Sequence, residues 1–209
     1  MMQLVEGFYI PDDDLPKHHI AQSVKDHDGA LHKEILKRAK QFRHMVDVGG
    51  NVGRWSSTFA SHFKNISAFE PAHYNIECFK ENCKQHDNIK LHEYGLSDTN
   101  STGVLDVIVP NHLGSTQVVE RSKGDIKLRP MDEMMFPWLD VLKIDVEGAE
   151  LKVLEGGKNT IDTCSPIICL ERCVFNQGNE GKEAINNWLI EMGYSRVYKI
   201  TRDCIYERL

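Results

Sequence analysis

Short apolar runs alternate with helical stripes along most of this chain. The apolar runs have the length and the β-branched composition of buried strands. They cover residues 45–48, 66–70, 88–94, 139–145 and 166–170. The stripes, in which apolar residues recur at helical spacing, cover residues 55–63, 71–85, 148–156 and 182–192. Strands that alternate with helices in this way predict an α/β fold with a doubly wound, mostly parallel sheet.

Smaller features surround that sheet. Residues 195–200 and 204–207 read as two closing strands, and their short connection predicts an antiparallel hairpin at the C-terminal end of the sheet. The runs at 104–109, 117–120 and 126–129 predict a hairpin-like insertion. The polar loop within it contains His112 and Ser115, which are candidates to reach a substrate.

The first part of the chain has its own pattern. Residues 30–42 place apolar side chains on one stripe, which predicts an amphipathic helix. We expect this helix to cover an edge of the sheet or the mouth of its binding site. Residues 1–40 are therefore expected to form an N-terminal extension, and residues 41–209 the main domain.

Composition excludes several classes of protein. The chain has 209 residues, a formal net charge of −6 and 41% hydrophobic residues, and it contains no basic run and no apolar segment long enough to span a bilayer. We therefore expect neither a nucleic-acid partner nor a membrane-embedded protein. The six cysteines contain no C-x-x-C pair, and the N-terminus lacks the features of a signal peptide, so we expect reduced thiols and a cytoplasmic location.

The most informative segment is the glycine turn at residues 47–53, D-V-G-G-N-V-G. A strand that runs through glycines into a helix brings bare main-chain N–H groups close to a nucleotide-like ligand. The next strand ends at Glu70, and a carboxylate at that place accepts hydrogen bonds from the hydroxyls of a ribose. Together these features predict an adenosine-type cofactor.

The identity of that cofactor depends on charge. The dinucleotide fingerprint needs a glycine where Val48 stands, and the chain has no P-loop motif. Asp47 would repel a pyrophosphate but attract a sulfonium or an ammonium group. The balance favours S-adenosylmethionine. A nicotinamide-dependent oxidoreductase and a non-catalytic module that binds an adenosyl cofactor remain as alternatives.

Acidic residues follow the ends of several strands, where ligands bind in such sheets. Asp145 ends a central strand and is placed to hold an ammonium group, to orient a substrate hydroxyl, or to bind a divalent cation together with Glu171. Glu147 is placed to act as a general base or as a helix cap, and Glu150 is expected to be a solvated helix residue. The catalytic candidates are thus Asp145, Glu147 and Glu171.

With these segments in place, residues 41–194 resemble the FkbM-type family of S-adenosylmethionine-dependent methyltransferases. The resemblance rests on the glycine turn, on A-F-E-P at 68–71, L-S-D at 96–98, L-K-I-D-V-E-G-A-E-L at 142–151 and V-L-E-G-G at 153–157. The strand that ends at Glu171 completes it. Family members usually have alanine where Gly50 stands, which is a mild departure.

The resemblance implies a class I methyltransferase fold, Rossmann-like, with a seven-stranded sheet whose last strand inserts antiparallel. It also implies methyl transfer to a hydroxyl oxygen of a sugar, a glycan or another natural product. Ser97 and Asp98 would border the adenine, and Asp145 would face the reacting centre. Substrate choice is expected in residues 1–40 and 111–123. The full set of expected cofactor contacts is Asp47, Gly49, Gly50, Asn51, Gly53, Glu70, Ser97, Asp98 and Asp145.

Overall fold

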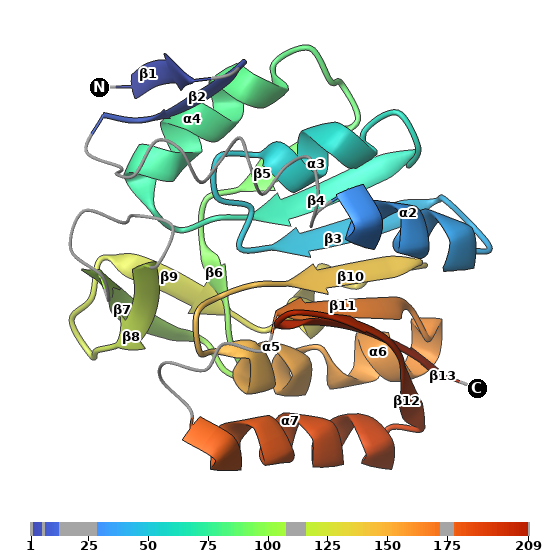
Figure 1. Ribbon diagram of the computed structural model, residues 1–209. Helices are drawn as coiled ribbons and strands as arrows, with labels where there is room; N and C mark the ends of the chain where they lie inside the picture. The colour runs from blue at the N-terminus through green and yellow to red at the C-terminus, as the bar shows by residue number, and fades with distance from the viewer. Residues whose placement is uncertain (1, 6, 13–28, 108–115, 172–177, 209) are drawn as a thin grey trace.

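The computed structural model describes residues 2–5, 7–12, 29–107, 116–171 and 178–208 (Figure 1). Its main sheet has seven strands in the order β12-β13-β11-β10-β3-β4-β5. These are β3 (His44–Val48), β4 (Asn65–Phe69), β5 (Ile89–His92), β10 (Val141–Ile144), β11 (Ile167–Glu171), β12 (Tyr194–Ile200) and β13 (Asp203–Arg208). The last strand of the chain, β13, lies between β11 and β12 and runs antiparallel to both, while the other pairs of the sheet are parallel. The predicted Rossmann-like α/β fold is confirmed.

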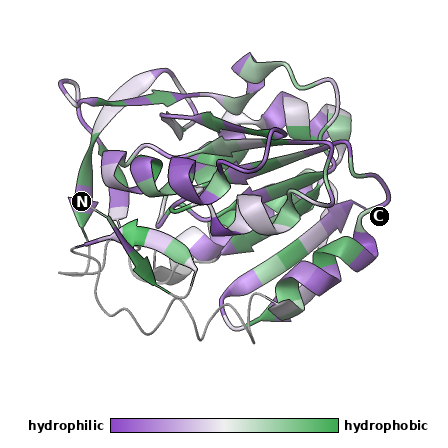
Figure 2. Ribbon diagram, turned by 90° about the horizontal axis from the view of Figure 1, so that it is seen from above, coloured by the Kyte–Doolittle hydropathy of each residue, from purple (hydrophilic) through white to green (hydrophobic). Residues whose placement is uncertain are grey.

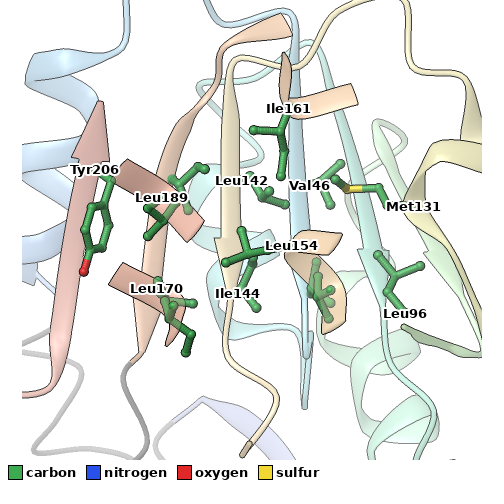
Figure 3. Close-up of a cluster of buried hydrophobic side chains, with 14 of the residues drawn as sticks. Val46, Leu96, Met131, Leu142, Ile144, Leu154, Ile161, Leu170, Leu189 and Tyr206 are labelled. Atoms are coloured by element: carbon green, nitrogen blue, oxygen red, sulfur yellow. The ribbon is translucent and has the colours of Figure 1, made fainter. Parts of the chain in front are cut away.

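Helices cover both faces of this sheet, because successive residues of each buried strand point to opposite sides. Leu142 and Ile144 of β10 pack in one core cluster with residues of α5 (Glu150–Gly156), α6 (Lys158–Cys164) and α7 (Gly178–Glu191), as Figure 3 shows. Val141 points to the other face, where α2 (Gly29–Arg38) and α3 (Arg54–Phe59) pack. Figure 2 shows the resulting layers, with hydrophobic strands in the interior.

The N-terminal helix lies elsewhere than expected. Leu31 and Ile35 of α2 are fully buried and pack with Met45 and Val141, which belong to the two central strands of the main sheet. The helix therefore covers the face of the sheet and neither its edge nor the mouth of a site. This position is explained by long-range packing, which the amphipathic stripe alone does not specify.

A short hairpin precedes this helix. It is formed by β1 (Met2–Val5) and β2 (Phe8–Pro11), and it packs on α4 (His73–Cys83). The side chain of Asn82 holds it there, because its amide oxygen accepts a hydrogen bond from the Tyr9 N–H (2.7 Å) and its amide nitrogen donates to the Tyr9 carbonyl (2.8 Å).

A second sheet lies beside the carboxyl ends of the main strands, and we call it the insertion sheet. Its four strands, in the order β6-β9-β7-β8, are β6 (Gly95–Leu96), β9 (Ile126–Arg129), β7 (Ser101–Val107) and β8 (Thr116–Glu120). Strands β7 and β8 form an antiparallel pair, and β9 joins them to β6. The sequence predicts this insertion as a hairpin, and it does not predict β6, the 3-10 helix Met131–Met134 or α6.

The cysteines and the helices give two further findings. Five cysteines are free thiols, namely Cys78, Cys83, Cys164, Cys169 and Cys204, and Cys173 lies outside the described residues. In the part of the chain that the structure describes, no helix has both the length and the hydrophobicity that crossing a bilayer requires.

Candidate functional site

A cleft opens at the carboxyl ends of β3, β4 and β10, with the insertion sheet as its far wall. It contains about 1060 Å³ of space, counting the part open to solvent. Of the residues expected to bind a cofactor, the cleft is lined by Gly49, Asn51, Glu70, Ser97 and Asp145. We call it the cofactor cleft.

The glycine turn follows β3 and fits tightly against the neighbouring strands. The N–H groups of Gly49 and Gly50 both donate to the carbonyl of Phe69 at 3.0 Å. Gly49 has a φ of 78°, and a Cβ there would lie 1.8 Å from the carbonyl oxygen of Asp145. Gly53 has a φ of 86°, and a Cβ there would meet Cys83 at 2.6 Å. Only glycine fits at these two positions, while Gly50 and Gly53 face the protein interior and do not line the cleft.

Glu70 is fixed at the end of β4 by main-chain donors. Its carboxylate accepts hydrogen bonds from the N–H groups of Asn51 (2.7 Å) and Ala72 (2.9 Å), one on each oxygen. The side chain is 5% exposed, and burial raises its pKa although these hydrogen bonds oppose the shift. Glu70 is thus held rigidly in the wall of the cleft, with oxygen lone pairs left for a ligand.

Asp47 is placed differently from the expectation that it contacts a cofactor. It lies inside β3 rather than in the turn, is fully buried, and does not line the cofactor cleft. The Ser56 hydroxyl donates to its Oδ2 at 2.7 Å, and Lys143 Nζ lies 3.2 Å from its Oδ1. Its charge therefore balances a buried lysine of the neighbouring strand.

Lys143 is a residue of the site that the sequence analysis did not single out. It lies in β10 between two apolar residues, and the unusual presence of a lysine in such a run is the signal that identifies it. Its Nζ donates to the Gly49 carbonyl at 2.8 Å and lies 3.6 Å from Asp145 Oδ2. Lys143 therefore connects the glycine turn to the acid at the end of β10.

Three carboxylates meet where the strands end. One oxygen each of Asp145, Glu147 and Glu171 lies within 4.8 Å of the others, so the structure brings the predicted catalytic candidates together. Glu147 has a φ of 53° in the turn after β10 and lines the cofactor cleft. Burial, together with the charge of Asp145 and a hydrogen bond to it, raises the pKa of Glu171 to about 9. The shift favours the protonated form of Glu171, and the guanidinium of Arg202, 2.9 Å away, opposes it.

A second pocket opens on the other side of Asp145. Asp145 lines both this pocket and the cofactor cleft. Its remaining lining is mainly polar and charged, with one large aromatic ring, and it consists of Arg54, Trp55, Lys143, Ile144, Cys169, Glu171, Thr201, Arg202 and Asp203. The two hollows are therefore neighbours that share one carboxylate.

The other residues singled out from the sequence are Ser97, Asp98, Glu150 and two loop residues. Ser97 lines the cofactor cleft, and its hydroxyl lies within hydrogen-bond distance of Asp98 Oδ1 (3.0 Å) and Glu120 Oε1 (2.9 Å), whereas Asp98 does not line the cleft. Glu150 is 1% exposed, not solvated, and its Oε1 accepts a hydrogen bond from the Gly148 N–H at 3.0 Å. Burial raises the pKa of Glu150 to about 7. His112 and Ser115 lie outside the described residues.

This geometry agrees with the result of a comparison with protein families. The model of the methyltransferase FkbM domain matches residues 47–196, which include the glycine turn, Glu70 and all three clustered acids. The chain belongs to this family. Membership favours methyl transfer over the nicotinamide-dependent alternative, and it agrees with the resemblance carried by the sequence motifs.

The chain is also similar to individual known proteins. It is 28% identical over 139 residues to the hexuronic acid methyltransferase AglP of Haloferax volcanii, a match that covers 64% of this chain and 58% of that protein. A solved FkbM methyltransferase from Methylobacillus flagellatus has a TM-score of 0.58 and 19% identity, with 79% of this chain and 43% of that chain covered. The chain thus spans less than two thirds of the length of either relative.

More distant structures share the fold. An rRNA methylase from Streptococcus thermophilus has a TM-score of 0.57 at 11% identity, and the match covers 89% of this chain and 98% of that chain. A Streptococcus mutans protein solved in complex with SAH has a TM-score of 0.57 at 11% identity, covering 88% and 99%. At these identities the likeness concerns the fold alone. Because an rRNA methylase shares the fold, the absence of a nucleic-acid partner stays a prediction.

Proposed function

We propose that this protein transfers the methyl group of S-adenosylmethionine to a hydroxyl oxygen of a sugar or a similar small polyhydroxylated acceptor. One observation carries the proposal, which is that the cofactor cleft and the second pocket meet at the carboxylate of Asp145. A ligand in the cleft and a ligand in the second pocket would therefore both lie beside this carboxylate, which brings a methyl donor and an acceptor hydroxyl close to the same acid. Family membership supplies the reaction class.

The charges of the cleft suit this cofactor. Glu70 retains acceptor capacity for ribose hydroxyls, and Asp145 and Glu147 place negative charge beside the glycine turn. Such charge attracts the ammonium and sulfonium groups of S-adenosylmethionine and repels the pyrophosphate of a dinucleotide. The residues of the cleft therefore fit an adenosyl cofactor better than NAD.

The chemistry requires alignment and removal of one proton. S-adenosylmethionine supplies a methyl group that is already activated for in-line displacement, so the protein mainly has to orient the acceptor oxygen. Asp145 lies between the two hollows and is placed to accept the proton of the acceptor hydroxyl. The raised pKa of Glu171 favours its protonated form, so we assign it to donate a hydrogen bond to Asp145 and not to act as the base. General base catalysis of this kind contributes roughly 10²–10⁴-fold.

The second pocket supports a carbohydrate acceptor. Trp55 offers an apolar ring, and Thr201 and Arg202 offer hydrogen-bond donors, a combination that suits a polar ring with several hydroxyls. The relative AglP is named for its action on a hexuronic acid, which supports a sugar as the acceptor class. The three acids form an oxygen-donor set of the kind that binds Mg²⁺, although Asp145 and Glu171 already have cationic neighbours.

The direct test is an assay of methyl transfer. The protein is incubated with S-adenosylmethionine and a panel of neutral and acidic sugars, and SAH release and the mass of the sugar product are recorded. We expect SAH and a sugar heavier by one methyl group, with both lost in Asp145→Asn. Glu155→Gln, an exposed acid on α5, is the matched control and should behave like the wild type. Binding of SAH without turnover on any acceptor would indicate a non-catalytic module instead.

A further inference from the structure

The insertion sheet directs an apolar face into the cofactor cleft. Each of its four strands contributes one aliphatic side chain to the lining, and these are Leu96, Leu105, Val118 and Leu128. Leu96 and Leu128 are 4% and 5% exposed, whereas Leu105 and Val118 are half-buried. The sequence analysis assigned residues 111–123 to substrate choice, whereas the structure places Val118, within that range, against the cofactor cleft.

The pairing of the strands shows that this face is specific. Leu105 and Val118 are cross-strand partners in the β7–β8 pair, and both line the cleft. The adjacent pair, Val104 and Val119, does not line it. Because side chains alternate across a sheet, Leu105 and Val118 share the face that borders the cleft, and Val104 and Val119 lie on the opposite face.

The lining of the cleft combines charged, polar and apolar side chains. Asn51, Asp145 and Glu147 lie where β3 and β10 end. Phe69, Pro71, Ala72 and the aliphatic side chains of the insertion sheet also line the cleft, together with the polar residues Asn75, Ser97, Thr116, Gln117, Glu120 and Lys152. An uncharged aromatic ring is favoured against the aliphatic side chains, and the cationic part of the same ligand beside Asp145 and Glu147.

Two sets of contacts hold the wall in place. The Tyr74 hydroxyl of α4 lies 2.8 Å from the Thr116 hydroxyl at the start of β8. At the other end of β8, Glu120 accepts from the Ser97 hydroxyl and pairs with Lys152 of α5, each at 2.9 Å. The strand is therefore tied at both ends to elements that border the cleft.

We infer that the insertion sheet is part of the cofactor site, and that Leu105 and Val118 form the surface against which the heterocyclic ring of the cofactor packs. This inference rests on the proposed function, because it takes the ligand to be an adenosyl compound. According to this inference, β7 and β8 contribute to the affinity for the cofactor, in addition to the glycine turn and the acids at the strand ends.

Calorimetry with two ligands tests the inference. S-adenosylhomocysteine is the complete ligand, and 5′-methylthioadenosine carries the ring and the ribose without the amino-acid part. We expect Leu105→Ala and Val118→Ala to weaken the binding of both ligands by the same factor, about ten-fold each, since each removes apolar contact with the ring. The matched controls Val104→Ala and Val119→Ala should bind within about two-fold of the wild type.

A second pair of variants separates loss of contact with the ligand from a general loosening of the insertion sheet. Val118→Phe adds apolar volume on the cleft side, so it should fold and yet block both ligands, whereas Val119→Phe should not. Unchanged binding by the Leu105 and Val118 variants would overturn the inference, as would a loss confined to S-adenosylhomocysteine, which would place these residues at the amino-acid end. If the wild type binds neither ligand, the proposed function itself is wrong, and not only the assignment of Leu105 and Val118 to binding of the ring.

Discussion

The Nζ of Lys143 donates a hydrogen bond of 2.8 Å to the main-chain carbonyl of Gly49. This bond joins a central strand to the glycine turn, and it is made by a lysine that is only 4% exposed. Burial would lower the pKa of Lys143, but the carboxylates of Asp47 and Asp145 raise it well above its usual range. The raised pKa favours the charged form of the lysine, which ties the glycine turn to β10.

Replacement of this cation should be costly. Lys143→Met leaves Asp47 fully buried without its counter-charge, so we expect the free energy of unfolding to fall by about 3–5 kcal/mol. Urea denaturation measures the change. The double variant Lys143→Met, Asp47→Asn removes both charges and should recover part of the loss. Equal stability of the single variant and the wild type would contradict the assigned ion pair.

Gly49 allows the effect of its close packing against Asp145 to be tested separately from the effect of its positive φ. Gly49→Ala would force a Cβ to 1.8 Å from the Asp145 carbonyl oxygen at a φ of 78°, so we expect loss of SAH binding and a lower melting temperature. Gly7→Ala is the matched control, because Gly7 has a φ of 90° but nothing within 4 Å of the added atom. If both variants lost the same stability and both bound SAH, the tight fit of the turn would not matter.

The buried Glu150 makes stability depend on pH. Its pKa is raised from 4.5 to about 7, so the folded state retains a proton that the unfolded state has lost. Stability should therefore fall as the pH rises from 4.5 to 7 and then level off, with a loss on the order of 3 kcal/mol from this group. Glu150→Gln keeps an acceptor for the Gly148 N–H and should lose less stability over the same range. Identical pH profiles of the two proteins, measured by denaturation, would refute this.

Asp145 and Glu171, two acids that line the second pocket, should contribute unequally to catalysis. Because the raised pKa of Glu171 favours its protonated form, Glu171→Gln mimics that form, and we expect kcat within about ten-fold of the wild type. Asp145→Asn removes the proposed base and should lower kcat by about 10²–10⁴-fold. Steady-state kinetics at neutral pH give both values. A larger loss in the Glu171 variant would make Glu171 the base.

Dependence on a metal ion can be measured directly. Lys143 lies 3.6 Å from Asp145, and Arg202 lies 2.9 Å from Glu171, so these two acids already have positive neighbours. We therefore expect methyl transfer to survive dialysis against EDTA. Loss of turnover that Mg²⁺ restores would instead show that a divalent cation binds the three acids.

Local patterns predicted the parts of the fold that depend on local sequence. The alternation of strands and helices, the glycine turn and the acid at the end of β4 all follow from residues close together in the chain. The burial of Asp47 depends on Lys143, which lies far along the chain, and the burial of Glu150 depends on how the whole turn after β10 packs. The insertion sheet also required long-range information, because β6 pairs with β9 across the intervening β7 and β8.

Titration calorimetry of S-adenosylhomocysteine tests the central claim most directly. We expect the wild type to bind one equivalent, Glu70→Gln to bind at least about ten-fold more weakly, and NAD to bind to neither protein. Two main-chain N–H groups hold Glu70 in place, and its remaining oxygen lone pairs are the proposed acceptors for the ribose hydroxyls, so the substitution should reduce affinity. Binding of NAD without S-adenosylhomocysteine, or equal binding by the Glu70 variant, would contradict the account.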